Sequence, residues 1–343
     1  MSPLDQSVIV PRESNPQNNP TKNSAIRVSI IIPALNEGRM IGLCLESLAQ
    51  MECPCNGFEV LLVDNGSRDN TIAIAESYKG RLNIRILQKT GVRISGLRNL
   101  GAHHSSGEIL AFLDADCLAP RGWLNRIREL APAEGAGVLG AHYLLPEEST
   151  WVGRTWHRYQ EAPKSGEVSH VPAGDLIMRR EDFLKVGGFD ESIQTNEDYE
   201  LCERARKAGM PVRAFPAIGV VHLGTAQSLR VFFRKQAWHG THVVKVFLRN
   251  MFGSHNLKAV LFAAYTLFCI VAMIAGGVWV AAGSGPWLFP LAANMALLLP
   301  PVALALRQVL ASGKWFDFFP LTALYLTYGV ARAKALLSIA NFF

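Results

Sequence analysis

Residues 259–306 contain no charged side chain, and no other feature restricts the fold of this 343-residue chain as strongly. A helix that spans a bilayer needs about 20 mainly apolar residues, so this stretch is long enough for two such helices. Gly283-Ser-Gly-Pro286 divides the stretch. The sequence therefore predicts a transmembrane helical hairpin made of residues 258–282 and 287–306.

Basic residues flank the predicted hairpin at Lys258, Arg307 and Lys314, which places both of its ends on the cytoplasmic side. A third segment, residues 315–336, contains Asp317 and either spans the bilayer or lies at its surface. These patterns predict a multi-pass protein of the inner (cell) membrane, with residues 257–343 as its membrane region and the preceding domain in the cytoplasm.

Charge is distributed unevenly along the chain. The formal net charge is +6, yet no Asp or Glu occurs between Glu203 and Asp317, while twelve Lys and Arg residues do. Such asymmetry is typical of proteins that bind nucleic acid or a membrane surface. These basic residues flank apolar segments and are not interleaved with aromatic platforms for bases, so we expect membrane lipid and no nucleic acid as the partner.

A neck of residues 228–256 precedes the hairpin. Arg230, Arg234, Lys245 and Arg249 fall on one side of a helical wheel, opposite mostly apolar residues, which favours a helix lying in the membrane interface. The alternative is a helix packed on the preceding domain with a solvated basic face. Gly240 argues against a single unbroken helix in either case.

The N-terminal residues 1–25 are rich in Asn, Pro and Ser and lack an apolar run, which predicts a disordered tail and no secretory signal. The six cysteines are irregularly spaced, so we expect free thiols and a reducing compartment. Cys53-Pro-Cys55 has no second pair with which to form a metal site.

Residues 26–227 alternate between short apolar runs and helical stretches, which predicts a mixed, mostly parallel α/β sheet. The expected strands are Val28–Ile32, Phe58–Val63, Ile84–Leu87, Ile109–Leu113, Val138–Ala141, Leu176–Met178 and Val212–Phe215. The expected helices cover residues 38–50, 69–79, 95–105, 122–131 and 197–208. Ligands of such sheets bind beyond the carboxyl ends of the strands.

Polar residues follow three of these strands, at Pro33–Glu37, Asp64 and Asp114-Ala-Asp116. Two carboxylates at a strand end suit Mg²⁺ or Mn²⁺ held together with substrate phosphates, although an Asp pair that caps a turn looks the same. Asp64 can accept hydrogen bonds from a base or a ribose. Glu37 fits the same pocket or is simply an acid favoured in the first turn of a helix.

Three further positions carry candidate chemistry. Arg98 lies in a helix after Gly91, whose loop could approach a phosphate, or else forms a surface salt bridge. Glu197 and Asp198 begin a helix, either as capping acids or with Asp198 as a general base of ordinary pKa. His222 follows an apolar run and is either structural or a further metal ligand.

Six motifs occur in the order VSIIIPALNE, FEVLLVDNGSRDNT, GLRNLGAHHSSGEILAFLDADC, GDLIMRREDFLKVGGFDE, NEDYELCERARKAG and VVHLG. Together they closely resemble family 2 glycosyltransferases over about residues 27–225. The resemblance implies a GT-A-type, Rossmann-like fold and sugar transfer with inversion from a nucleotide sugar, with a UDP-sugar favoured.

The resemblance also implies roles for single residues. Pro33, Glu37 and Asp64 would line the nucleotide pocket, with Asp114 near the ribose and Asp116 and His222 on the metal. Asp198 would be the catalytic base. We add Arg98, Asp175 of the fourth motif and Glu197 of the fifth to the expected substrate-binding residues.

Processive synthases of this family carry a Gln-x-x-Arg-Trp signature after the base, whereas this chain reads Gln236-Ala-Trp-His-Gly240. We therefore expect one sugar to be moved per lipid-linked or other glycan acceptor at the membrane. The alternatives are a subunit of a processive polysaccharide synthase, a nucleotidyltransferase and an inactive membrane scaffold. A nucleotidyltransferase would normally show a basic, Gly-rich phosphate loop, and the first motif has none.

Overall fold

The computed structural model describes residues 27–51, 57–132, 135, 137–161, 165–193, 195–249 and 254–339. The predicted tail at 1–25 and the Cys53-Pro-Cys55 pair lie outside these residues. The four cysteines whose state is described, Cys44, Cys117, Cys202 and Cys269, are free and buried, in agreement with the expected free thiols.

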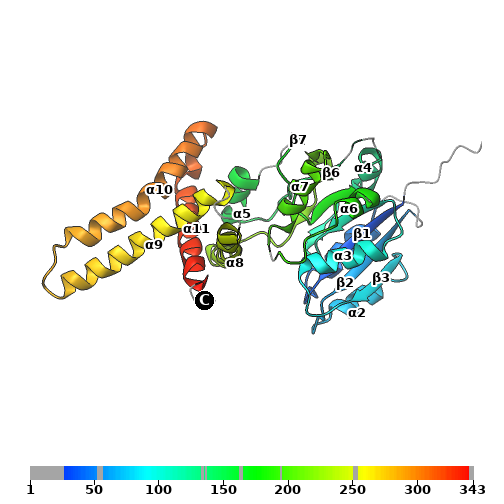
Figure 1. Ribbon diagram of the computed structural model, residues 1–343, viewed down its shortest axis with the longest axis horizontal. Helices are drawn as coiled ribbons and strands as arrows, with labels where there is room; N and C mark the ends of the chain where they lie inside the picture. Colours follow the sequence, from blue (N-terminus) through cyan, green and yellow to red (C-terminus); the bar gives the residue numbers. More distant parts are fainter. Residues whose placement is uncertain are drawn as a thin grey trace, which may run out of the picture.

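An eight-stranded sheet forms the N-terminal part, with strand order β3-β2-β1-β4-β8-β6-β9-β7 (Figure 1). Parallel pairing joins β3, β2, β1 and β4, whereas β8 runs antiparallel to both β4 and β6. The strands are β1 Val28–Ala34, β2 Phe58–Asp64, β3 Ile84–Gln88, β4 Ile109–Leu113, β6 Val138–Gly140, β7 Gly166–Glu167, β8 Asp175–Arg179 and β9 Val212–Ala214. The predicted mixed, mostly parallel sheet is confirmed.

Helices cover both faces of this sheet. Apolar residues of α1 (Ile41–Ala49) and α4 (Trp123–Leu130) pack on one face, where Ile30 and Ile32 of β1 point. Residues of α3 (Ile94–His104), α6 (Arg180–Lys185) and α7 (Glu197–Lys207) pack on the other face around Ile31. This alternation explains why β1 is apolar at nearly every position. The helix α2 (Thr71–Ser77) packs against α1.

Several short elements have no counterpart in the sequence prediction. A second sheet pairs β5 (Cys117–Leu118) with β10 (Val221–His222), and a 3₁₀ turn covers Pro216–Ile218. Between β6 and β7 lie α5 (Trp151–Trp156) and a π-helical turn, His157–Glu161. Segments of two to six residues are too short to show a hydrophobic period, which is why they were missed.

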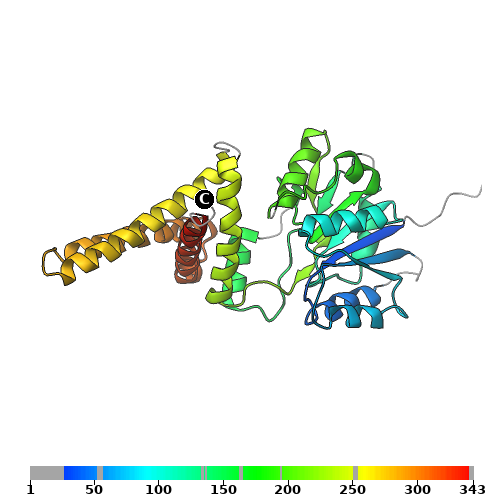
Figure 2. The same ribbon diagram turned by 60° about the horizontal axis from the view of Figure 1, so that its bottom comes forward.

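The C-terminal part consists of α8 (Leu229–Arg249), α9 (Ser254–Ala281), α10 (Leu288–Ser312), a 3₁₀ turn Trp315–Asp317 and α11 (Phe318–Ile339). Leu257–Ala281 and Leu288–Ser312 are long and apolar enough to cross a membrane, and their most hydrophobic windows are only 22% and 11% buried. These two helices form a hairpin that projects away from the sheet (Figures 1 and 2). The hairpin agrees with the predicted 258–282 and 287–306.

The helix α8 packs mainly on α11 and not on the sheet, which removes the alternative of a helix lying on the domain (Figure 2). Phe232 is buried against Trp156 of α5 and Leu324 of α11. The expected break at Gly240 is wrong, because α8 continues through it. A Cβ at Gly240 would lie 2.7 Å from the Cβ of Ala335, so glycine lets the two helices approach closely.

The third predicted segment, residues 315–336, forms the 3₁₀ turn and most of α11, which packs against α8, α9 and α10. Its acid, Asp317, is buried and forms an ion pair with Arg158 of the π-helical turn. Tyr159 donates a hydrogen bond of 2.9 Å to the same carboxylate. Asp317 therefore connects the start of α11 to the segment between β6 and β7.

Candidate active site

The strands β1, β2 and β4 end side by side, because β1 pairs in parallel with both of its neighbours. Ala34 lies opposite Asp64 in this register. As expected from the sequence, the residues that follow the three strands meet at one edge of the sheet. This edge gathers Pro33–Glu37, Asp64 and Asp114–Asp116.

Hydrogen bonds hold the first two of these loops together. Asn36, in the left-handed region at φ 56°, accepts from the Arg68 amide at 2.8 Å, and its own amide donates to Ser67 Oγ at 2.8 Å. Asp64 is fully buried and accepts from the Gly66 and Ser67 amides at 2.8 and 3.0 Å. Asp64 thus shapes its own loop, and its predicted contact with a base stays a prediction.

Glu37 faces the acidic strand ends. Burial and the charges of Asp116 and Asp114 raise the pKa of Glu37 to about 7. Three carboxyl groups that repel one another are typical of a place where a cation binds.

Arg98 lies inside the protein, so the alternative of a surface salt bridge is wrong. Its side chain is 2% exposed, and its two Nη atoms donate to Asp114 Oδ1 at 2.7 Å and to Glu197 Oε1 at 2.6 Å. Arg98 therefore fixes the end of β4 relative to the start of α7. The expected contact of Arg98 with substrate stays a prediction.

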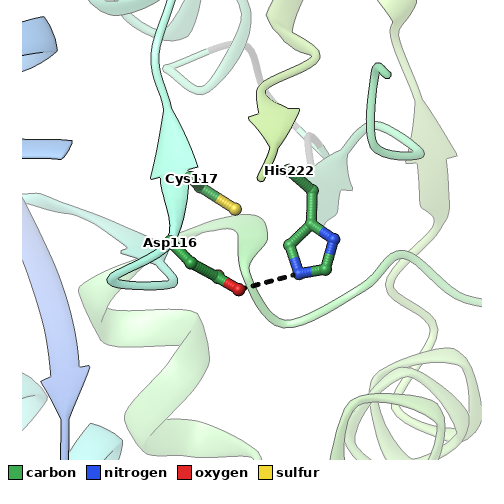
Figure 3. A group of neighbouring side chains, drawn as sticks. All are labelled: Asp116, Cys117 and His222. Atoms are coloured by element: carbon green, nitrogen blue, oxygen red, sulfur yellow. Dashed lines mark ion pairs between the residues drawn. The ribbon is translucent and has the colours of Figure 1, made fainter. Parts of the chain in front are cut away.

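Asp116, Cys117 and His222 form a cluster in which one ligand atom of each lies within 4.8 Å of the others (Figure 3). His222 Nε2 lies 3.3 Å from Asp116 Oδ2. The cluster exists because β5 pairs with β10, with Cys117 opposite His222. Sequence reasoning found Asp116 and His222 but missed Cys117. Cys117 comes beside His222 only through the pairing of two strands of two residues each, and no local motif indicates that pairing.

The donor set of this cluster fits a divalent cation. Burial raises the pKa of Asp116, but the hydrogen bond and charge of His222 and the charge of Lys235 outweigh it and hold this pKa below the ordinary value. Asp116 therefore offers an ionised oxygen at neutral pH. A carboxylate oxygen and an imidazole nitrogen suit Mn²⁺ or Mg²⁺. Gly224 leaves room here, because a Cβ would lie 2.1 Å from Asp116 Oδ2.

Tyr143 is a site residue that sequence reasoning missed. Its ring stacks on the imidazole of His222, with centroids 4.5 Å apart and planes 13° apart. Its hydroxyl donates to Asp114 Oδ2 at 3.2 Å and accepts from the Gly174 amide at 3.2 Å. One tyrosine therefore touches both the proposed ribose-side acid and the proposed metal ligand. No motif around Tyr143 indicates this role.

Asp198 is the second residue of α7, and Asn196, which directly precedes this helix, is left-handed at φ 65°. The Ala173 amide donates to Asp198 Oδ2 at 3.2 Å, and the Tyr199 amide donates to Oδ1 at 2.7 Å. Burial raises the pKa of Asp198, so the expectation of an ordinary pKa is wrong. A raised pKa brings a carboxylate closer to the value that suits a general base.

Asp175 is completely buried at the start of β8 and accepts from Trp123 Nε1 at 3.3 Å. Burial raises the pKa of Asp175 well above its ordinary value. Asp175 pairs with Leu113, the last residue of β4, in the sheet. Its expected contact with substrate stays a prediction.

Comparison with known proteins identifies the class to which this fold and site belong. Residues 29–187 match the profile of glycosyl transferase family 2, and the chain belongs to this family, with a GT-A fold. The matched range includes Pro33 through Asp175 but not Asp198 or His222.

Two curated relatives illustrate the similarity. The glycosyltransferase AglE of Haloferax volcanii is 32% identical over 53% of this chain and 62% of its own length. The succinoglycan biosynthesis protein ExoA of Rhizobium meliloti is 29% identical over 79% of this chain and 90% of its own length. The chain spans less than two thirds of the length of the first curated relatives that it matches.

Among solved structures, a mannosyltransferase from Pyrobaculum calidifontis, determined in complex with GDP-mannose and Mn²⁺, has a similar fold. The TM-score is 0.58 at 19% identity, and the match covers 92% of this chain and 87% of that one. Because the match covers almost the whole chain, the order of a GT-A sheet followed by long helices is common to both proteins.

Proposed function

We propose that this protein is an inverting, metal-dependent hexosyltransferase that moves a single sugar from a nucleotide sugar to a lipid-linked or other glycan acceptor at the membrane. The observation that carries the proposal is that Asp116 and His222 meet just beyond the end of β4, while Asp198, whose pKa burial raises, lies close enough for the charge of Asp114 to raise that pKa further. Family membership supports the reaction class.

In this proposal Pro33, Glu37 and Asp64 line the nucleotide pocket, and Asp114 faces the ribose. Asp116 and His222 would hold Mg²⁺ or Mn²⁺, and a bound cation would neutralise the diphosphate of the donor. The Pyrobaculum relative was solved with Mn²⁺ and GDP-mannose. For this chain a UDP-sugar is the favoured donor, on the strength of its motifs.

Asp198 would remove the proton of an acceptor hydroxyl while that oxygen attacks the anomeric carbon and the donor's C–O bond breaks. Two backbone amides orient its carboxylate, and burial raises its pKa. Arg98 would hold Glu197, the residue next to Asp198, in place. Sugar transfer then proceeds by a single displacement, which inverts the anomeric configuration.

The helical region would place this site at a membrane. The hairpin α9–α10 is apolar and mostly exposed, and burying such a surface in lipid is favourable. Lys258, Arg307 and Lys314 would keep the sheet domain on the cytoplasmic side of the inner membrane. The absence of arginine between Gln236 and Gly240 supports single transfer over processive synthesis.

The test is sugar transfer by the full chain in membranes, comparing Asp198→Asn with Glu200→Gln. Loss of a general base lowers the rate by roughly 10²–10⁴. Glu200 lies on the same helix and binds Arg204 instead, so its variant should keep the rate. Full activity of Asp198→Asn would remove Asp198 as the base. Pyrophosphate release from a nucleoside triphosphate would indicate a nucleotidyltransferase instead.

A further inference from the structure

Asn294 is a polar side chain on the outside of the apolar hairpin α9–α10. It belongs to the uncharged stretch 259–306 and lies between Trp287 near the turn and Arg307 at the other end. The rise of an α-helix places Asn294 about 10 Å from Trp287 and about 20 Å from Arg307. Its side chain is exposed. In a bilayer, whose hydrocarbon layer is about 30 Å thick, Asn294 would therefore face lipid inside that layer.

The carboxamide of Asn294 has one weak partner within the molecule. Its Nδ2 atom donates to the sulfur of Met273 at 3.6 Å, and its Oδ1 atom accepts no hydrogen bond from any residue that the structure describes. Two other polar side chains of the hairpin, Tyr265 and Thr266, each donate to a backbone carbonyl at 2.8 Å. A thioether is a weak acceptor, and an amide left unsatisfied in hydrocarbon is unfavourable. Asn294 therefore needs a polar partner that the described residues do not supply.

Asn294 lies within an exposed face of α10. Trp287, Leu291 and Leu298 recur on the same side of the helix and are 65%, 46% and 37% exposed. We call these three residues and Asn294 the Asn294 face. Further along α10 the same side is buried against α11, at Ala305 and Val309. The turn end of the hairpin extends beyond α11, which leaves the Asn294 face uncovered by the described residues (Figures 1 and 2).

A second copy of the chain fits this face. Two copies inserted in the same orientation are related by a twofold axis along the membrane normal, which brings Asn294 and the partner's Asn294 to the same depth. A carboxamide carries both donors and acceptors, so Nδ2 of each asparagine can donate to Oδ1 of the other. Such side-chain bonds hold transmembrane helices together. A different membrane protein would have to present a polar group at this depth, whereas a second copy always does.

We propose that two copies of this chain associate in the membrane through the Asn294 face, with the two Asn294 amides hydrogen-bonded to each other. Trp287, Leu291 and Leu298 pack around this polar pair. The twofold axis along the membrane normal keeps both sheet domains on the same side of the bilayer. The inference rests on the membrane placement in the proposed function and not on the sugar-transfer reaction.

The experiment measures energy transfer between full-length chains labelled at the N-terminus, in phosphatidylcholine vesicles at a series of protein-to-lipid ratios. Wild type should form dimers. Asn294→Leu should raise the dissociation constant of the dimer about 3–30-fold, the range expected for interhelical side-chain hydrogen bonds in a membrane. Asn294→Gln keeps the amide and should stay within about threefold of wild type. Met295→Leu, a change at the exposed neighbouring residue off this face, is the matched control and should leave the constant unchanged.

Disulfide formation tests the geometry of the contact. Two Asn294→Cys chains should form an intermolecular disulfide on mild oxidation in the same vesicles, because a twofold axis brings this position next to itself. The control is Phe268→Cys on α9, which is 71% exposed and lies off the proposed face. It should cross-link no more than wild type, whose own six cysteines set the background. Equal cross-linking at both positions would contradict a specific Asn294 contact.

Monomeric wild type in the vesicles would overturn the proposal, and this is the outcome if lipid or a helix of another protein covers the face instead. Energy transfer that Asn294→Leu leaves unchanged would also overturn it, because the contact would then lie elsewhere. Flotation of the vesicles separates this inference from the membrane placement. A chain that does not float with them overturns both, whereas a chain that floats as a monomer overturns the inference alone.

Discussion

The ring of Tyr143 lies flat on the imidazole of His222 at a centroid distance of 4.5 Å, and its hydroxyl reaches Asp114 Oδ2 at 3.2 Å. Tyr143 thereby connects the two acids of the Asp114-Ala-Asp116 motif through His222, which bonds Asp116. This arrangement gives Tyr143 a positioning role in the proposed metal site.

Tyr143→Ala should weaken Mn²⁺ binding by about tenfold, because residues that orient metal ligands typically contribute at least that much to affinity. Tyr143→Phe keeps the stacked ring and should change Mn²⁺ affinity by less than about threefold. Calorimetric titration of Mn²⁺ into the full chain with UDP measures both. Equal affinities in wild type and Tyr143→Ala would show that stacking does not orient His222.

Arg98→Met should lower the free energy of unfolding by about 3–5 kcal/mol, because it leaves the buried Glu197 and the half-buried Asp114 without their shared cation. Arg126→Met is the matched control. Arg126 pairs with Glu129 at the surface, and such pairs contribute about 0–1 kcal/mol. Urea unfolding followed by circular dichroism compares the two variants. A similar shift in both would mean that the buried ion pair does not stabilise the fold.

Glu37 should make stability fall as pH rises. Its folded pKa, about 7, lies above the ordinary 4.5, so the folded state holds this proton more tightly. The contribution is fully present below about pH 4.5 and is lost as pH rises through 7. The melting temperature of Glu37→Gln minus that of wild type should therefore be larger at pH 8 than at pH 5. A pH-independent difference between the two proteins would contradict the raised pKa.

Asp317→Asn should destabilise the contact between the start of α11 and the π-helical turn His157–Glu161. The substitution weakens the ion pair with Arg158 and the bond from Tyr159, and hydrogen bonds to charged groups contribute about 1.5–3 kcal/mol each. We expect a melting temperature several degrees lower than that of Glu76→Gln, an exposed acid paired with Lys79. An unchanged melting temperature would mean that Asp317 does not stabilise this contact.

Much of the fold could be predicted because its strands are continuous apolar runs and its helices are separated by clear polar turns. The strand ends Asp64 and Asp114 converge for the same reason, since parallel pairing aligns the carboxyl ends. The hairpin followed from the absence of charge between Lys258 and Arg307.

Other features depend on contacts between residues far apart in the chain. Arg98 meets Glu197 across 99 positions, and Cys117 meets His222 through a two-residue bridge with no periodic pattern. Burial raises the pKa of Asp198, and no local motif indicates that this residue is buried. Gly240 looked like a helix breaker because its partner, Ala335, lies on another helix.

The most direct measurement of the central claim is transfer of radiolabelled sugar from UDP- and GDP-sugars to membrane lipid by the full chain, with and without a chelator. The account predicts that the label enters the lipid extract only with Mn²⁺ or Mg²⁺ present. Asp116→Asn should reduce this transfer by at least about a hundredfold, because the variant loses an ionised ligand. Transfer that persists in the chelator, or that Asp116→Asn leaves unchanged, would contradict it.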